Sequence, residues 1–455
     1  MAKPGLPQGM RDFNAETLAK RNYILNTIRS VFLLYGFEQL ETPAMENLQT
    51  LIGKYGEEGD KLIFKVLNNG LNDPKNREKA EAGFSKVLNG ISSPELTERA
   101  LKYDLTIPFA RYVAMNHGSL TFPYKRFQMQ PVWRADRPQK GRYREFIQCD
   151  ADVVGSKSLL NEIDLANIYH DVFTRLSLKE YTLLINNRKI LAGLANICGS
   201  PDLLTPLTVA IDKLDKIGAE KVFEELGSRN IPQQALKKVE EYLSIKGSNE
   251  EKLQQLSVMM ANDNLAMEGI SEASFVISAC SGINIKFDPT LARGLNYYTG
   301  SIFEVKAPAQ AKMGSIGGGG RYDDLTGLFG VPGLPGVGIS FGVDRIYDVL
   351  EELQLFSDDL TNGPVVLFFN LGQEEIAYAS DLVREVRQKG ISSEIYHEPT
   401  KFDKQFRYAE KRRFRYVVII GSNELSSKKA VIKELSTGHQ DTVNFSDIAN
   451  YFAAR

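Results

Sequence analysis

The segment from residue 124 to residue 155 constrains the fold of this chain more than any other stretch. Two strand-like runs, 124–135 and 143–154, flank a polar loop that contains Pro138 and Gly141. Proline and glycine between two such runs are turn residues. The pattern predicts a β-hairpin, and the remaining elements have to be arranged around it.

The two faces of the second run differ in chemical character. Side chains alternate between the faces of a strand, so residues two apart lie on the same side. One face is apolar and suits a protein core: Ile147, Cys149, Ala151 and Val153. The other face combines a cation, an aromatic ring, an amide and carboxylates, which do not suit a core: Arg144, Phe146, Gln148, Asp150 and Asp152.

The hairpin is also rich in positive charge. Residues 124–145 contain seven Lys and Arg residues against two Asp and Glu residues. Arginines hold phosphate oxygens well, and carboxylates hold amines and imidazoles. The hairpin is therefore a candidate ligand site, and a solvated edge hairpin is the alternative, since antiparallel sheets often have one polar face in water.

Composition limits the class of protein. A chain of 455 residues with 43% hydrophobic and 25% charged residues fits a folded, water-soluble protein of about two to four domains. The formal net charge of −2 provides no global attraction for nucleic acid, so such binding would need local patches. The N-terminus lacks the apolar core of a signal peptide, and no run approaches the roughly 20 apolar residues of a membrane helix.

Cysteine and histidine usage fits a cytoplasmic protein without structural metal. The three cysteines, Cys149, Cys198 and Cys280, are far apart, which predicts buried thiols in a reducing compartment. The histidines lack metal-ligand spacing and are interpreted as structural or surface groups: His117, His170, His397 and His439.

Two local patterns can be interpreted either as ligand contacts or as structural groups. Asp104 and Thr106 share strand parity before Pro108 and could hold an ammonium group, but on these residues alone we favour helix capping. Arg345 lies near the start of a predicted helix, where the dipole disfavours a cation. Its position indicates either a nearby anion or simple surface exposure.

Three further segments have distinct compositions. Residues 68–94 are polar and turn-rich, which predicts an exposed insertion. Residues 193–264 are rich in Lys and Glu at helical spacing, which predicts a separate helical module without chemistry of its own. The four glycines at 317–320 indicate either a ligand lying on the sheet or a flexible loop, and they are not followed by the Gly-Lys-Ser/Thr of a P-loop.

The C-terminal part predicts a small α/β domain with a largely parallel sheet. Strand and helix patterns alternate from residue 364 to residue 420. Residues 401–415 combine seven Lys and Arg residues with four aromatic residues. Basic and aromatic residues on one element suit RNA, and a solvated helix face is the equally weighted alternative.

Four segments in a fixed order resemble the motifs of class II aminoacyl-tRNA synthetases. They are GFEQLETP, the arginine hairpin, ARGLNYYTG with GGGGRYD, and the glycine-rich strand leading into VDRI. RGLNYY, GGGRYD and the loop RPQKGRYREF are similar to the signature of histidyl-tRNA synthetases, and the likeness runs from about Gly9 to the C-terminus. Asn296 departs from this signature, which commonly has Asp there, so the role of this position is open.

The resemblance implies an α+β fold with three parts. A catalytic core with a mostly antiparallel sheet flanked by helices would cover 1–192 and 282–355, a helical insertion 193–281, and a C-terminal α/β anticodon-binding domain 364–455. It further implies a homodimer and a histidine–tRNA ligase. Such an enzyme would use ATP with Mg²⁺ to form histidyl-adenylate and would transfer histidine to the 3′ end of tRNA(His).

The implied residue roles divide by substrate. ATP would be held by Arg134 at the α-phosphate, by Arg142 and Arg345 at the outer phosphates, and by Phe146 at the adenine. Histidine would be held at its amino-acid end by Asp104, Thr106 and Gln148, and at its imidazole by Asp152 and Tyr298, with Tyr297 as a further histidine contact. Arg134 and Arg293 would be catalytic and would also contact histidine. The residues implied in tRNA contact are Arg137, Gln139, Lys411, Arg412 and Arg413.

Two non-enzymatic hypotheses stand beside the ligase. Paralogues of these synthetases act as histidine-sensing regulatory subunits of histidine biosynthesis, but they generally lack the anticodon domain and lose catalytic groups. An RNA-binding protein without aminoacylation is the other hypothesis. Histidine-dependent exchange of pyrophosphate into ATP separates both from the enzyme.

Overall fold

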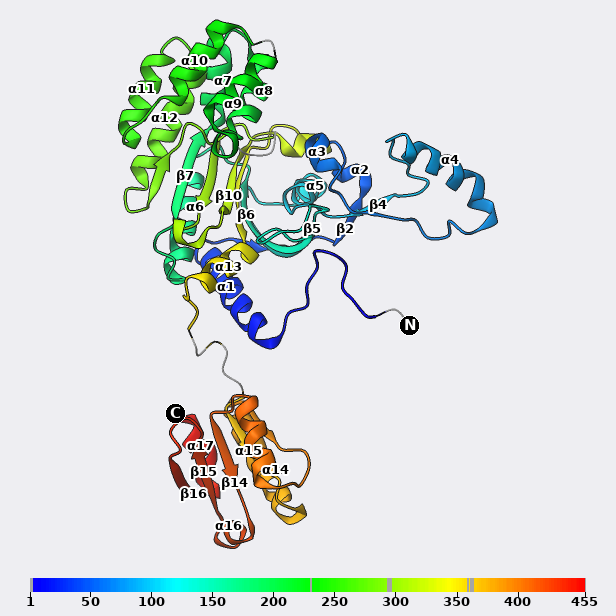
Figure 1. The fold of residues 1–455 in the computed structure, drawn as a ribbon, viewed down its shortest axis with the longest axis vertical. Helices are drawn as coiled ribbons and strands as arrows, with labels where there is room; N and C mark the ends of the chain where they lie inside the picture. Colours follow the sequence, from blue (N-terminus) through cyan, green and yellow to red (C-terminus); the bar gives the residue numbers. More distant parts are fainter. Residues whose placement is uncertain (1–2, 230, 293–296, 358–359, 361–363, 455) are drawn as a thin grey trace. The chain divides into compact units, whose positions relative to one another are not determined.

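The computed structural model describes residues 3–229, 231–292, 297–357, 360 and 364–454. The chain forms two compact units, Met1–Phe356 and Ser357–Arg455 (Figure 1). Arg293, for which the resemblance implies a catalytic role, and Asn296, whose role was left open, lie outside the described residues.

An eight-stranded sheet forms the centre of the first unit. Its strand order is β1-β5-β6-β11-β10-β9-β7-β8. Only the β1–β5 and β7–β8 pairs are parallel, so the prediction of a mostly antiparallel sheet is confirmed. The strands are β1 (Glu38–Gln39), β5 (Tyr124–Trp133), β6 (Glu145–Val154), β7 (Thr182–Asn187), β8 (Ile285–Phe287), β9 (Ser301–Lys306), β10 (Ser315–Tyr322) and β11 (Gly336–Gly342).

One face of this sheet carries the main hydrophobic core. The helices that cover it are α1 (Ala15–Leu34), α6 (Leu160–Arg175) and α13 (Val343–Glu352). The predicted apolar face of the hairpin is confirmed, because Cys149, Ala151 and Val153 are buried in this core. Helix α1 begins where the Asn14 side chain accepts a hydrogen bond from the Thr17 backbone N–H at 2.8 Å.

A group of helices packs on the opposite face at the β7–β8 end. Leu184, Phe287 and Ile302 point from the sheet into the core of this group. The helices are α7 (Arg188–Ile197), α8 (Leu204–Ile211), α9 (Leu214–Ser228), α10 (Gln233–Leu243), α11 (Asn249–Met259) and α12 (Asn264–Ala279). The module is helical as expected, while its boundaries of 193–281 stay a prediction.

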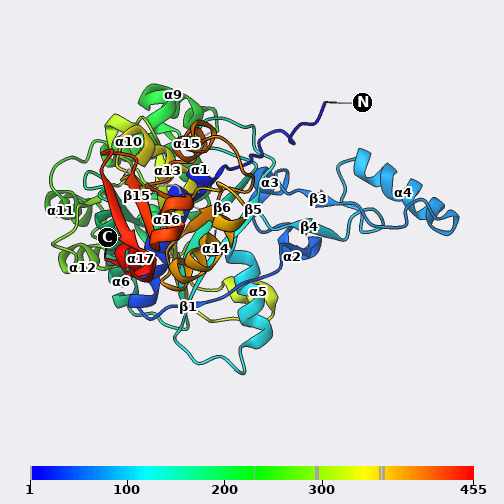
Figure 2. The ribbon, with the colours of Figure 1, turned by 90° about the horizontal axis from the view of Figure 1, so that it is seen from below.

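A small three-stranded sheet lies beside the hairpin. It has the order β2-β4-β3 and carries a projecting arm that contains α4 (Arg77–Leu88) (Figures 1 and 2). The predicted insertion at 68–94 is exposed, but its helix was not predicted. The associated elements are β2 (Met45–Asn47), β3 (Lys65–Val66), β4 (Arg99–Leu101), α2 (Leu48–Leu51), α3 (Gly56–Asp60) and α5 (Thr106–Asn116).

The second unit is a five-stranded sheet with the order β13-β12-β14-β15-β16. The prediction of a largely parallel sheet is correct only for β13, β12 and β14, because β15 and β16 add as an antiparallel hairpin. The strands are β12 (Val366–Phe368), β13 (Ser393–Ile395), β14 (Tyr416–Ile419), β15 (Lys429–Glu434) and β16 (Gln440–Asn444). The helices are α14 (Gln373–Gln388), α15 (Phe402–Lys411), α16 (Ser422–Ser427) and α17 (Ile448–Ala453).

The three cysteines are free and buried, as predicted. None of the helices in the described part of the chain is long and apolar enough to span a membrane.

Candidate active site

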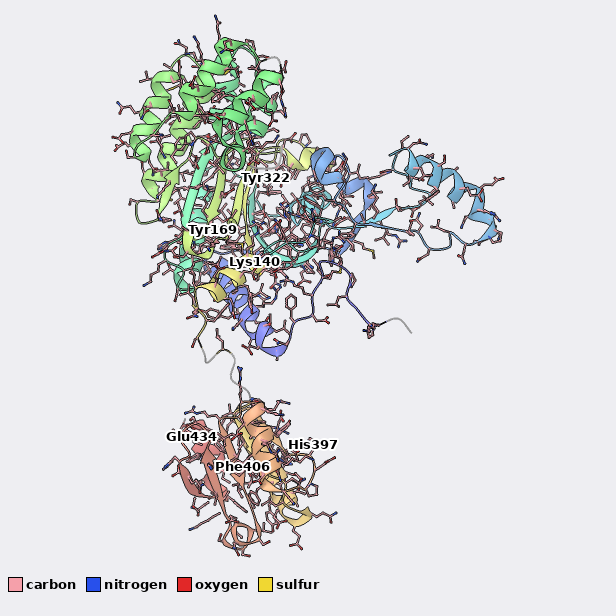
Figure 3. The ribbon with its side chains drawn as sticks, viewed as in Figure 1. Lys140, Tyr169, Tyr322, His397, Phe406 and Glu434 are labelled. Carbon is pink, nitrogen blue, oxygen red and sulfur yellow. The ribbon has the colours of Figure 1, made fainter. Side chains whose placement is uncertain are left out.

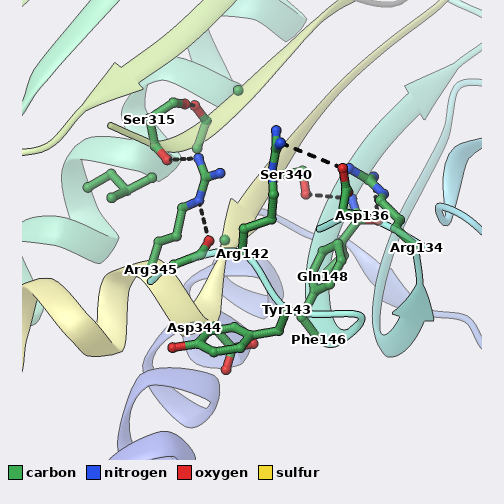
Figure 4. Close-up of a pocket in the computed structure, with 15 residues that line it drawn as sticks. Arg134, Asp136, Arg142, Tyr143, Phe146, Gln148, Ser315, Ser340, Asp344 and Arg345 are labelled. Atoms are coloured by element: carbon green, nitrogen blue, oxygen red, sulfur yellow. Dashed lines mark hydrogen bonds and ion pairs between the residues drawn. The ribbon is translucent and has the colours of Figure 1, made fainter. Parts of the chain in front are cut away.

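Two adjoining pockets open on the sheet face opposite the main core. The larger has a volume of about 290 Å³ and the smaller about 80 Å³. Both are lined by Arg134, Gln148, Gly318 and Ser340, so they form one continuous trough across β6, β10 and β11. Tyr322 lies at this sheet in Figure 3, and Figure 4 shows the larger pocket.

The register of the hairpin explains why its polar face lines the trough. β5 and β6 pair without interruption from Tyr124 opposite Val154 to Trp133 opposite Glu145. Alternation along β6 then brings to the trough the residues that the sequence grouped together: Phe146, Gln148, Asp150 and Asp152. Arg144 differs from the prediction, because its Nε donates to the Asp136 carbonyl at 3.1 Å and holds the loop instead.

Three arginines line the larger pocket, each from a different element. Arg134 follows β5; its Nε donates to the Tyr103 carbonyl at 3.0 Å and an Nη atom donates to Gln148 Oε1 at 3.4 Å. Its guanidinium carbon also lies 5.2 Å from the centre of the Phe146 ring. These contacts fix the planar donor group at the junction of the two pockets.

The other two arginines border the outer part of the larger pocket. Arg142 lies in the hairpin loop with a half-exposed side chain, 3.6 Å from Asp136. Arg345 donates to the Gly141 carbonyl at 2.9 Å and to the Ser315 carbonyl at 2.7 Å (Figure 4). Arg345 therefore joins the loop to β10, and the alternative of simple surface exposure is wrong.

Asp104 caps a helix and also lines the smaller pocket. Its Oδ1 accepts from the Ile107 backbone N–H at 3.2 Å and from the Tyr55 hydroxyl at 2.9 Å, so capping is confirmed. With this cap, α5 begins at Thr106. Oδ2 of Asp104 is buried without a hydrogen-bond partner among the described residues, and the side chain lines the smaller pocket.

Asp152 is held by two residues that the sequence analysis did not assign. Its Oδ1 accepts from the Tyr322 hydroxyl at 2.7 Å, and its Oδ2 pairs with Arg126 at 2.9 Å. Arg126 faces Asp152 directly across the hairpin, so strand parity applied to the first strand would have found it. Tyr55 reaches Asp104 across 49 residues without any pattern that signals the contact.

The glycine run forms a central strand, so the flexible-loop alternative is wrong. A Cβ at Gly317 would meet the Tyr169 ring at 2.8 Å, which shows that tight packing against α6 requires this glycine. Tyr169 also donates to the carbonyls of Gly318 and Ser340 at 3.0 Å. Gly318 lines both pockets, and its bare backbone leaves the trough open.

Burial dominates the electrostatics of the smaller pocket. It raises the pKa values of the Asp104 and Asp152 carboxyls, with Arg126 opposing the rise at Asp152. Burial also raises the pKa of the Tyr298 phenol, and the nearby carboxylates Asp152 and Asp150 add to this effect. Such a pocket favours a ligand that brings positive charge and N–H donors.

The remaining predicted site residues lie in three places. Thr106, Tyr297 and Tyr298 line the smaller pocket. Arg137 and Gln139 are exposed on the hairpin loop. Lys411, Arg412 and Arg413 lie in the second unit, at and beyond the end of α15.

The basic and aromatic element of the second unit is only partly available to a ligand. Phe414 is buried and unavailable for stacking on RNA, while Phe406 and Tyr408 pack against the same small core but are only partly buried, so their role stays a prediction. Phe402 is 44% exposed. Arg412 pairs with Glu394 at 2.7 Å. Phe406, Tyr408 and Phe414 therefore face the core, whereas Phe402 and the cations of this element face outward.

A mostly antiparallel sheet with an arginine hairpin beside a glycine-rich strand is the catalytic arrangement of the class II aminoacyl-tRNA synthetases. The family profile described as "Histidyl-tRNA synthetase" matches residues 91–346, and the profile "Anticodon binding domain" matches residues 365–455. The chain belongs to the histidyl-tRNA synthetase family.

Relatives and solved structures agree with this assignment. The chain is 51% identical to the histidine–tRNA ligase of Phocaeicola vulgatus over 97% of both chains, and 49% identical to that of Bacteroides fragilis strain YCH46 over 98% of both. The crystal structure of histidyl-tRNA synthetase from Nostoc sp. PCC 7120 matches with a TM-score of 0.82 and 31% identity over the full length of both chains.

A second solved structure shares the fold alone. It is titled an ATP phosphoribosyltransferase regulatory subunit/histidyl-tRNA synthetase from Bacillus halodurans. Its TM-score is 0.72 at 19% identity, over 92% of this chain and 98% of that one. The fold by itself therefore does not distinguish a ligase from a regulatory subunit. The residues that line the site have to be compared to make this distinction.

Proposed function

We propose that this protein activates L-histidine with ATP and transfers it to the 3′ end of tRNA(His). The observation that carries this proposal is the identity of 51% to a histidine–tRNA ligase over 97% of both chains. The continuous trough supports it, because three arginines at one end suit a triphosphate and buried carboxyls at the other suit a small cationic amino acid.

ATP would occupy the larger pocket. Arg134 at the junction suits the α-phosphate, while Arg142 and Arg345 suit the outer phosphates. Phe146 offers an aromatic face for the adenine. Mg²⁺ would enter with ATP as part of the substrate, and the described residues contain no cluster of three or more His, Cys, Asp or Glu that would hold a resident metal.

Histidine would occupy the smaller pocket. The open Oδ2 of Asp104, with Thr106 and Gln148, suits the α-ammonium end. Asp152, Tyr297 and Tyr298 surround the place of the imidazole. A pocket that pairs buried polar groups with a polar substrate rejects analogues that lack the polar atom by about 10⁴-fold or more.

The first reaction step would be in-line attack of the histidine carboxylate on the α-phosphorus, with pyrophosphate leaving. Its main requirements are positioning and cancellation of negative charge. Arg134 is held between both pockets, where it can contact both reactants, and Arg293 is proposed to share this charge. In the second step the terminal ribose hydroxyl of tRNA would attack the acyl carbon and displace AMP.

The tRNA would contact both units. Arg137 and Gln139 on the exposed loop are proposed to meet the acceptor end. Lys411, Arg412 and Arg413 lie in the unit matched by the anticodon-binding profile and are proposed to neutralise phosphates. A homodimer and a cytoplasmic location remain proposals carried over from the family.

The deciding experiment is histidine-dependent exchange of pyrophosphate into ATP, followed by charging of tRNA(His). We expect both activities with histidine and neither with other amino acids. Exchange without charging would indicate a protein that only forms the adenylate. A protein that binds histidine but shows neither exchange nor charging would instead be a regulatory paralogue. The arginines that line the larger pocket and the presence of the second unit argue against this alternative.

A further inference from the structure

The smaller pocket contains a third carboxyl, that of Asp150, which the roles above do not use. Asp150 lies on β6 between Gln148 and Asp152 and faces the same side of the sheet. It is 2% exposed. Its neighbours in the flanking strands are Gln128 on β5 and Ser340 on β11.

The oxygens of the three carboxyls differ in their existing partners. Both oxygens of Asp152 are engaged, one by Tyr322 and one by Arg126. Among the described residues, Oδ2 of Asp104 and Oδ1 of Asp150 are buried and have no hydrogen-bond partner. A buried acceptor without a donor is costly, and both residues line the smaller pocket, so their open oxygens indicate that a ligand supplies the donors.

The two open oxygens suit different parts of the substrate. Oδ2 of Asp104 lies with Thr106 and Gln148, where the α-ammonium is proposed to bind. Asp150 is adjacent to Asp152 on the same face of β6, two residues from the carboxyl that is proposed to face the ring. Asp150 therefore belongs to the end of the pocket that would receive the ring.

We propose that Asp150 is a specificity-determining residue whose Oδ1 accepts a hydrogen bond from the imidazole N–H of bound histidine. This inference rests on the proposed function. Both oxygens of Asp152 are already bonded to Arg126 and Tyr322. Asp152 then holds these two side chains in place and forms the part of the pocket wall that faces the ring. The Tyr298 hydroxyl remains for the second ring nitrogen.

The charges around Asp150 fit this role. The positive charge of Arg126 and a hydrogen bond with the Ser340 side chain lower the pKa of Asp150, while the negative charges of Asp152 and Asp104 raise it. Burial, more than any of these neighbours, raises the pKa of Asp150 to about 7. An N–H donor brought to Oδ1 stabilises the ionised carboxylate, so ring binding and ionisation of Asp150 reinforce each other.

The test is a chemical double-mutant cycle on the full-length chain. In Asp150→Asn we expect the KM for histidine in pyrophosphate exchange to rise about 10- to 100-fold, since a charge-assisted hydrogen bond is weakened. The KM for ATP should change less than about twofold. Inhibition by thienylalanine, whose ring has no N–H, should change less than about threefold, because that ring cannot use Asp150.

Equal losses for histidine and thienylalanine, or an unchanged KM for histidine, would overturn the inference. Asp164→Asn is the control, since it makes the same charge change at a surface carboxylate that pairs with Lys125 and lines neither pocket, and it is expected to leave both constants unaltered. If Asp150→Asn does not fold, Asp150→Ser replaces it with the same expected pattern. A wild-type chain without histidine-dependent exchange would refute the proposed function itself, which is a different outcome.

Discussion

At the residue scale, the ion pair between Arg126 and Asp152 is the most heavily buried charge contact of the site. The two side chains are 0% and 4% exposed. Removing one partner of a buried pair leaves the other charge without compensation and costs about 3–5 kcal/mol. The Arg126 guanidinium also packs 4.0 Å from the centre of the Phe109 ring, so its loss disturbs the wall of the smaller pocket.

We therefore expect Arg126→Met to lower the free energy of unfolding of the first unit by about 3–5 kcal/mol. The chain has a single tryptophan, Trp133 on β5, so its fluorescence in urea reports on this unit. The double variant with Asp152→Asn should recover more than half of the loss, because the uncompensated carboxylate is gone. A loss below about 1 kcal/mol in the single variant would show that the pair contributes little.

Asp150 predicts a pH dependence of stability with a defined sign. Its pKa is raised in the folded protein to about 7, so the folded state holds a proton that the unfolded chain releases near pH 4. The stability contributed by this proton is present below pH 4 and is lost as the pH rises through 7. Arg126, Asp152, Asp104 and Ser340 are the groups that set this shift.

We compare the free energies of unfolding of the unliganded Asp150→Asn variant and the unliganded wild-type chain. The variant's value minus the wild-type value should be larger at pH 8 than at pH 5 by roughly 2–3 kcal/mol. Urea unfolding monitored by Trp133 at the two pH values measures this difference. Parallel pH profiles of the two proteins would mean that the Asp150 carboxyl does not titrate in this range in the folded state.

The sequence predicted residue roles well where a strand pattern was involved. Alternation alone grouped Phe146, Gln148 and Asp152, and the same rule extended to β5 would have added Arg126. Tyr55 could not be found, because its hydroxyl reaches Asp104 through the packing of a separate small sheet. Contacts of this kind depend on tertiary structure that local patterns do not encode.

At the scale of elements, the N-terminal segment holds the arginine loop against α13. The Gly9 carbonyl accepts from the Arg144 backbone N–H at 3.0 Å. The Arg11 guanidinium carbon lies 3.2 Å from the centre of the Tyr143 ring, and Arg11 also pairs with Asp344. Tyr143 and Asp344 line the larger pocket, so this segment positions the loop that carries Arg142.

We expect Arg11→Ala to raise the KM for ATP about 5- to 10-fold, because the loop and α13 lose a shared contact near the proposed phosphate site. The KM for histidine should change less than about twofold. Lys20→Ala is the control, since Lys20 joins α1 to α13 through Glu351 at 2.9 Å but lines neither pocket. Equal effects of the two variants on ATP would remove the positioning role of Arg11.

Elements with a clear period were predicted within a few residues, and those without one were missed. Ile24, Ile28 and Val31 recur at three- and four-residue steps, which predicts a helix at 16–35, and helix α1 spans Ala15–Leu34 with these residues buried. Helix α4 was missed because its apolar side chains do not face a core, with Phe84 57% and Leu88 72% exposed. The periodicity rule assumes a buried stripe, and this arm has none.

At the scale of the whole molecule, the sheet order was beyond the reach of pattern analysis. β6 pairs with β11, and β7 pairs with β9, across large sequence separations. Many such pairings are compatible with the same strand patterns, so the resemblance to a known family was needed to choose among them. The division into two units was easier, because a polar, turn-rich linker marks it in the sequence.

This division predicts that the two reaction steps can be separated by surface substitutions in the second unit. Adenylate formation needs only the trough of the first unit, whereas charging also needs phosphate contacts elsewhere on the tRNA. Arg412 is unsuitable for a test, because it pairs with Glu394 and packs on Tyr408. Arg413 has a φ of 56°, a left-handed conformation that asparagine tolerates, so Arg413→Asn keeps the end of α15 intact.

The double variant Lys411→Gln, Arg413→Asn should raise the KM for tRNA about 5- to 20-fold and reduce its salt dependence, because it removes the two cations that are proposed to contact phosphates. Histidine-dependent pyrophosphate exchange should remain within about twofold of the wild-type rate. Arg384→Gln on α14 is the control, since it removes one cation from an exposed ion pair with Asp381 on the same unit. Unchanged tRNA kinetics in the double variant would show that these two cations do not contact the tRNA, and recognition of the tRNA would then have to reside on other surfaces.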